Sequence, residues 1–279
     1  MYDLGAGKIM RFERDDCLHS LDQAVETLER IRNARVNQDA RALHVSLLAL
    51  AYSKKYDKIG RSEDLGAALQ YSKLALSLNK SEWRMNEFHC IHGLVLLSQS
   101  SRAEGDFVKK LGEAVTHFRL AVELAERYRG TQQQACPYHY LSKALRSQFH
   151  HTNKLVDIEE SVNYGRRAIQ YIPEKHMMQP EIANNLSLSL YEYHKTGVGR
   201  DDDLREAFEL AFTAFSETPD GHIHELAYYE DLSQIATTVR SSSRELQGLF
   251  SEDELELIRL GMWVCIFFLL DGSSRSDDR

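Results

Sequence analysis

Five segments of the chain place a leucine or isoleucine three residues before a small residue, as in DLGAALQYSKLAL. The small residues are Ala24, Ala68, Ala114, Ser161 and Ala207. Successive members of this series are 44, 46, 47 and 46 residues apart. A sequence period of this size is typical of proteins built from stacked helical repeats. The period therefore predicts the architecture more strongly than any single motif does.

A second small residue follows seven positions after the first in four of the five segments. These residues are Ala75, Ala121, Ala168 and Ala214, whereas the first segment has Ile31 there. Apolar or small residues also recur at helical intervals around them, so each segment predicts an amphipathic helix. Two small residues two turns apart leave a shallow strip on that helix. We expect a neighbouring helix to pack closely against the strip.

A further helix is predicted before each of these segments, and one more after the last. The predicted ranges are Leu4–Arg14, Ala40–Lys58, Asn86–Ser101, Ala135–His151, Glu181–Lys195 and His222–Arg240. Glycine closes a helix most easily, asparagine less easily and aspartate least easily of the three. The residues at which the first five helices end are Asp16, Gly60, Gly105, Asn153 and Gly197. The repeat unit is thus helix, short loop, helix and turn, which predicts about twelve helices in a right-handed superhelix without a sheet.

Three stretches resemble a known family: LGAGKIMRFER, NNLSLSLYEYHKTGVGRDDDLREAF and ETPDGHIHELAYYEDLS. They are similar to the degenerate tetratricopeptide-like repeats of large fungal proteins, whose arrays commonly precede a caspase-like protease domain of the CHAT type. The resemblance implies an all-α fold, a tetratricopeptide-like α-solenoid of about five to six helix-turn-helix repeats with a C-terminal helix. It also implies that the array is a binding or regulatory scaffold. About forty residues follow Arg240, too few for a protease domain, so proteolysis is not expected.

The end of the chain differs in character from the repeats. We expect the repeat array in residues 1–250, an apolar helix in 251–270 and a disordered polar tail in 271–279. Ser251 has the side chain of an N-cap, and the run Met262–Leu270 is entirely apolar. A run of this length is too short to span a bilayer. The predicted helix therefore needs cover from the last repeat and a second surface, from a second copy of the chain in a homodimer through the C-terminal helix, or from a partner domain.

The composition excludes some partners and locations. The 279 residues carry 42 acidic against 34 basic side chains, a net charge of −8, which argues against a nucleic-acid partner. No apolar run follows the first methionine, so we expect no secretory signal. The four cysteines, Cys17, Cys90, Cys136 and Cys265, form no CxxC pair. Reduced thiols in a cytoplasmic protein are therefore expected.

Few residues carry recognisable chemistry. The stretch Gly5–Lys8 has neither the spacing nor the hydroxyl of a phosphate-binding loop, so no nucleotide cofactor is predicted. His89 and His92 lie one helical turn apart, and His139 falls on the equivalent helix of the next repeat. Imidazoles on successive helices could converge on a metal, which needs three or four ligands. No HExxH pattern accompanies them, so we predict neither a metal nor another cofactor.

Three classes of function remain. The favoured one is a protein-interaction scaffold that binds a peptide or a partner helix in the concave groove of the array. The alternative is an enzyme that uses the groove as a pocket, with histidines as metal ligands or acid–base groups. A self-associating structural module is the third. The predicted groove residues are the polar and aromatic side chains His89, His92, Tyr138, His139, Arg146, Asn184, Asn185 and Tyr228.

Overall fold

A computed structural model describes residues 2–15, 17–32, 37–79, 84–100, 106–128, 134–242, 247–248, 250–252 and 255. These residues form eleven α-helices and no strand, which confirms the all-α prediction for this part of the chain. The helices are α1 (Tyr2–Asp15), α2 (Leu18–Arg32), α3 (Gln38–Ile59), α4 (Ser62–Leu78), α5 (Met85–Ser100), α6 (Phe107–Arg127), α7 (Ala135–Thr152), α8 (Leu155–Tyr171), α9 (Gln179–Lys195), α10 (Asp201–Ser216) and α11 (Glu225–Ser241).

The six helices predicted outside the small-residue segments correspond to the odd-numbered helices. Their bounds agree with the prediction to within two residues, with one exception. The last of them begins at Glu225 rather than at His222, because Gly221 has a φ of 76° and the following residues form turns. His222 and His224 therefore precede α11. Nearly all of the predicted apolar helix at 251–270 and the whole tail at 271–279 lie outside the described residues.

The predicted helix stops are seen wherever the structure describes them. Gly60 has a φ of 80° and donates its N–H to the Tyr56 carbonyl at 2.7 Å. Asn153, with a φ of 53°, does the same toward the Phe149 carbonyl at 2.8 Å. Gly197 has a φ of 76°. In this left-handed conformation glycine has no Cβ to clash, and asparagine is tolerated better than most residues. Asp16 and Gly105 lie outside the described residues.

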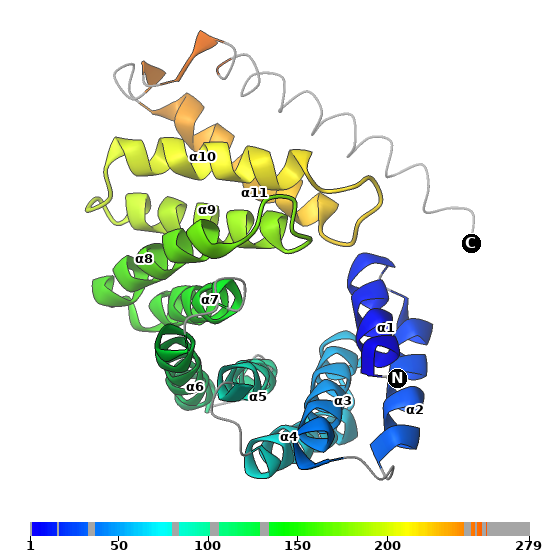
Figure 1. The fold of residues 1–279 in the computed structure, drawn as a ribbon. Coiled ribbons are helices and arrows are strands. Elements are labelled where there is room, and N and C mark those ends of the chain that lie inside the picture. The colour runs from blue at the N-terminus through cyan, green and yellow to red at the C-terminus, as the bar shows by residue number, and fades with distance from the viewer. Residues whose placement is uncertain are drawn as a thin grey trace. The chain divides into compact units, whose positions relative to one another are not determined.

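The chain divides into two compact units, residues 1–176 with 221–223 and residues 177–220 with 224–279. In the first unit, helices pack in the pairs α1–α2, α3–α4, α5–α6 and α7–α8 (Figure 1). The second unit contains the pair α9–α10, against which α11 packs. Adjacent helix pairs packed in succession are what the repeat period predicts. Among the described residues, no helix has the length and apolar character needed to cross a membrane.

Successive pairs of the first unit meet where each even-numbered helix packs against the odd-numbered helix that follows it. Each odd-numbered helix contacts the next, α1 with α3, α3 with α5 and α5 with α7. Consecutive even-numbered helices make at most marginal contacts with each other. The odd-numbered helices therefore form a continuous layer, whereas the backbones of consecutive even-numbered helices lie further apart and side chains such as Arg119 and Glu160 connect α6 to α8.

The small-residue strip is the packing surface within each pair. All five residues of the first series have no exposed surface, and the four alanines that follow seven positions later are also buried. In the pair α5–α6, a Cβ built on Gly93 would lie 2.6 Å from the ring of Phe118, so only glycine permits this ring to lie there. The side chain of Ile31 lies outside the described residues.

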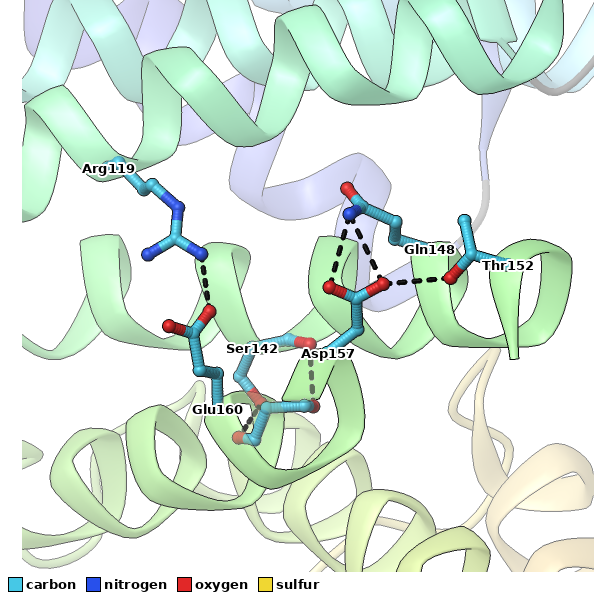
Figure 2. A network of polar contacts seen from close by, with 7 residues as sticks. Arg119, Ser142, Gln148, Thr152, Asp157 and Glu160 are labelled. Carbon is cyan, nitrogen blue, oxygen red and sulfur yellow. Dashed lines mark hydrogen bonds and ion pairs between the residues drawn. The ribbon is translucent and has the colours of Figure 1, made fainter. Parts of the chain in front are cut away.

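The pair α7–α8 is joined by reciprocal hydrogen bonds between its small residues. Ser142 Oγ donates to the Ser161 carbonyl at 2.8 Å, and Ser161 Oγ donates to the Ser142 carbonyl at the same distance (Figure 2). At the start of α8, the carboxylate of Asp157 accepts hydrogen bonds from Gln148 and Thr152 of α7. Buried polar groups that are all paired hold helices in one register. These contacts therefore hold α7 and α8 in one register.

Candidate functional site

The described part of the first unit contains a cavity of about 320 Å³ in the gap between α4 and α6. Its floor is α5, because the even-numbered helices on either side do not close over that helix. The volume is at the lower end of the range found for small-molecule sites. We call it the α4–α6 cleft. The residues that line it are Leu69, Lys73, His92, Leu96, Gln99, Lys110, Glu113, Thr116 and His117.

His92 lies on the floor of the cleft with 6% of its surface exposed. Its Nδ1 is 2.9 Å from Ser72 Oγ, and Ser72 Oγ donates to the Leu69 carbonyl at 3.1 Å. The Leu69 carbonyl can only accept, so a hydroxyl proton directed to it leaves the hydroxyl oxygen to accept from His92 Nδ1–H, and we assign this tautomer. His92 Nε2 then carries a lone pair, and no described residue hydrogen-bonds to it.

Two further histidines form a group with His92. His89 Nδ1 and His117 Nδ1 are 2.9 Å apart, and their rings are stacked. The His117 ring meets the His92 ring edge-on, with centroids 4.6 Å apart. These three imidazoles, from α5 and α6, are the histidine cluster of the first unit.

Burial keeps this cluster uncharged at neutral pH. It lowers the pKa of His89 to about 4, and the adjacent His117 lowers it in the same direction. The pKa of His92 is also about 4, first because of burial and then because of His117, Lys73 and His89, while Glu113 acts in the opposite direction. Burial lowers the pKa of His117 as well, against the effect of Glu113. All three side chains can therefore exchange hydrogen bonds as neutral imidazoles.

The charged side chains of the cleft leave one positive charge uncompensated. Lys110 Nζ lies 3.0 Å from Glu113 Oε2, so these two groups neutralise each other. Lys73 forms no hydrogen bond or ion pair with any described residue. Its ammonium is nonetheless close enough to lower the pKa of His92, an effect smaller than that of burial. The cleft thus combines a cation, neutral imidazoles and two leucine side chains.

Tyr138, another predicted groove residue, belongs to a different cluster in the same unit. Its hydroxyl donates to Glu126 Oε1 at 2.8 Å, and its ring is stacked with those of Tyr164 and Tyr171. Arg167 lies over the Tyr138 ring and forms an ion pair with Glu126 at 3.0 Å. Burial, followed by the bond to Glu126, raises the pKa of Tyr138 to about 12. Only 2% of Tyr138 is exposed, so the residue mainly joins α6, α7 and α8.

The other predicted groove residues are not gathered at one site. His139 is fully buried on α7, and Arg146 is half-buried on the same helix. Asn184, Asn185 and Tyr228 are buried in the second unit. There, Asn184 Nδ2 donates to Asp231 Oδ2 at 2.8 Å and connects α9 to α11. Burial raises the pKa of Tyr228, and Glu181 and Asp231 add to this effect.

The structure brings His89 and His92 together with residues that sequence reasoning did not select. These are His117, Ser72 and Lys73, of which His117 has a recognisable signal. It lies three residues after Ala114, on the face that the small-residue series identifies as the packing surface. Across the described residues, no three His, Cys, Asp or Glu side chains are placed to hold a metal ion.

Comparisons with known proteins give no family assignment. No known family model and no curated protein matches the chain. One similar solved structure is described as "Computational Design of Self-Assembling Cyclic Protein Homooligomers". It shares 13% sequence identity, with 91% of this chain and 95% of that chain covered, and the TM-score is 0.24. At this TM-score the likeness supports no conclusion about fold or function.

Proposed function

We propose that the chain is a protein-interaction scaffold, a tetratricopeptide-like α-solenoid that binds a peptide or a partner helix. The observation that carries this proposal is the continuous layer formed by α1, α3, α5 and α7. An array whose repeats lie closer together on one side curves toward that side, and the inner helices then offer an extended surface. A peptide or helix can bind along such a surface through several side chains at once.

The composition of this layer supports a peptide as the ligand. Partly exposed side chains recur on α5 at Glu87, Ile91, Leu94 and Ser98. On α7, the half-buried residues with the same spacing are Cys136, Tyr140, Lys143 and Ser147. These rows contain apolar, charged and hydroxyl groups, so one surface offers both hydrophobic contacts and hydrogen bonds. We refer to the two rows together as the α5–α7 face.

Neighbouring helices of the layer are held in register by polar contacts. Ser53 Oγ of α3 lies 3.0 Å from Ser98 Oγ of α5, and Ser98 Oγ also donates to Asp57 at 3.0 Å. A surface fixed in this way needs little rearrangement when it binds, which lowers the entropic cost of association. The contacts therefore favour a preformed binding surface.

A peptide selection tests the proposal. The purified full chain would be exposed to a displayed library of short linear peptides, and enriched peptides would be synthesised and titrated. We expect Leu94→Arg, in the middle of the α5–α7 face, to weaken their binding at least about tenfold, because a charged side chain replaces an apolar contact.

Leu120→Arg is the matched control, because Leu120 is 39% exposed on α6 and lies outside that face. It should change the affinity by less than about twofold. Equal effects of the two substitutions would place binding elsewhere. A library that yields no peptide dependent on Leu94 would contradict the scaffold proposal.

A further inference from the structure

The α4–α6 cleft is separate from the α5–α7 face and does not depend on the scaffold proposal. It opens between two even-numbered helices, whereas the proposed peptide surface belongs to the odd-numbered ones. Its lining combines a cation, a buried imidazole and apolar walls, and each of these places a requirement on a ligand.

Lys73 calls for an anionic group. It is the lining cation without a partner among the described residues, since Lys110 is paired with Glu113. With the histidines neutral, the charged side chains that line the cleft sum to one positive charge. The Gln99 amide also lines the cleft and forms no hydrogen bond with any described residue. A carboxylate can accept from both groups.

His92 calls for a hydrogen-bond donor. Ser72 holds its Nδ1, so the lone pair on Nε2 is left for a ligand. A bare carboxylate has no proton to offer this nitrogen, whereas a hydroxyl beside the carboxylate does. Leu69 and Leu96 provide contacts for the apolar remainder of the molecule. Inorganic anions would make no use of these two side chains.

We propose that the α4–α6 cleft binds a small organic acid that carries a hydroxyl group beside its carboxylate and an aliphatic tail. Lys73 pairs with the carboxylate, His92 Nε2 accepts from the hydroxyl, and Leu69 and Leu96 contact the tail. A site that hydrogen-bonds a ligand hydroxyl discriminates against the analogue that lacks it, because the buried acceptor is then left without a partner.

The test titrates four probes into the full chain. Binding is measured from the ring-proton NMR signals of His92 and His117. The reference probe is 2-hydroxy-4-methylpentanoate, and we expect it to shift both signals in a saturable manner. Removing the hydroxyl, in 4-methylpentanoate, should weaken binding about tenfold. The neutral amide 2-hydroxy-4-methylpentanamide should bind at least about tenfold more weakly, and inorganic phosphate should not compete.

Two variants connect these preferences to residues. Lys73→Gln should weaken binding of the hydroxy acid about tenfold, whereas Lys109→Gln should change it less than about twofold, because Lys109 is exposed outside the lining. His92→Gln should bring the affinities for the hydroxy acid and the plain acid close together. Lys73 is exposed, so its substitution tests the proposal even where the buried His92 variant does not fold.

Three results would overturn the assignment. The first is the absence of saturable shifts at millimolar hydroxy acid. The second is an equal loss of affinity in Lys73→Gln and Lys109→Gln, which would reflect the general field of the surface. The third is competition by phosphate at the same concentration as the hydroxy acid, which would mean that any anion suffices.

Discussion

The pairs α5–α6 and α7–α8 hold neighbouring places in the array and pack through the same small-residue strip, yet their interiors differ. In α7–α8, Ser142 and Ser161 bond to each other's carbonyls, and Asp157 is paired with residues of α7. The strip of α5–α6 instead lies beside three imidazoles and an open cleft. The repeat period thus determines that the helices pack. The residues at facing positions determine whether the interface is sealed or hollow.

Overpacking the strip should give the largest effect and should be worse in the sealed pair. Ser161→Leu adds volume at a site with no exposed surface and removes a hydrogen bond, so we expect a loss of about 3 kcal/mol in the free energy of unfolding. Ala114→Leu adds volume alone and should cost about 2 kcal/mol. Urea denaturation of both variants measures this, with Lys109→Leu on the exposed surface as the control. An Ala114 variant that is less stable than the Ser161 variant would reverse the comparison.

Acid should lower the stability of the pair α5–α6, which contains the cleft, more than that of the pair α7–α8. The pKa of His92 is about 4 in the folded chain, and that of an unfolded histidine is near 6.5. Between these values the unfolded chain binds more protons, so stability falls as the pH drops below about 6.5. For His92 the loss by pH 5 is about 2 kcal/mol. The groups that face this ring are Lys73, His89, Glu113 and His117.

The measurement compares unfolding free energies at pH 7.5 and pH 5 in the original chain and in His92→Gln. The variant should lose about 2 kcal/mol less over this interval, whatever its stability at pH 7.5. Gln148→Leu, which alters the sealed pair, should leave the pH dependence between these two values unchanged. A His92 variant with the original pH dependence would show that folding does not lower the pKa of this imidazole.

The close approach at Gly93 should have an intermediate effect. Gly93→Ala places a Cβ 2.6 Å from the Phe118 ring, and the resulting clash outweighs the better helix propensity of alanine. We expect a net loss of about 1 kcal/mol. Gly66→Ala on α4 is the matched control, since no atom lies within 4 Å of its added Cβ, and it should stabilise the chain by about 0.5 kcal/mol. Thermal unfolding distinguishes the two, and a stabilising Gly93→Ala would contradict the packing.

The smallest effect is expected where the sealed pair turns from α7 to α8. Asn153 adopts a φ of 53°, a conformation that glycine adopts more easily. Asn153→Gly should therefore stabilise the chain by about 0.5 kcal/mol. Gly60→Asn, at the equivalent turn between α3 and α4, should destabilise it by a similar amount. Thermal unfolding should show a higher midpoint for Asn153→Gly and a lower midpoint for Gly60→Asn.

The small-residue series allowed the even-numbered helices to be predicted well, because each has one packing face and a clear period. The ends of the odd-numbered helices could also be predicted, but not which of their faces points toward the groove. α5 contacts α3, α4, α6 and α7, so much of its surface is buried and polar residues such as His92 do not mark an exposed face. His139 was selected for the groove by residue type, and the structure encloses it completely. Tertiary packing decides which side chains of different helices meet. Lys73 of α4 and His92 of α5, which line the same cleft, are an example.

The uneven contact between repeats also has a mechanical consequence for the first unit. The layer α1–α3–α5–α7 is continuous, and ion pairs such as Arg119–Glu160 join α6 to α8, whereas no hydrogen bond or ion pair between described residues joins α4 to α6. We therefore expect a bending load on the first unit to widen or narrow the space between α4 and α6 first. The α4–α6 cleft occupies that space, so bending of the first unit would change the width of the cleft.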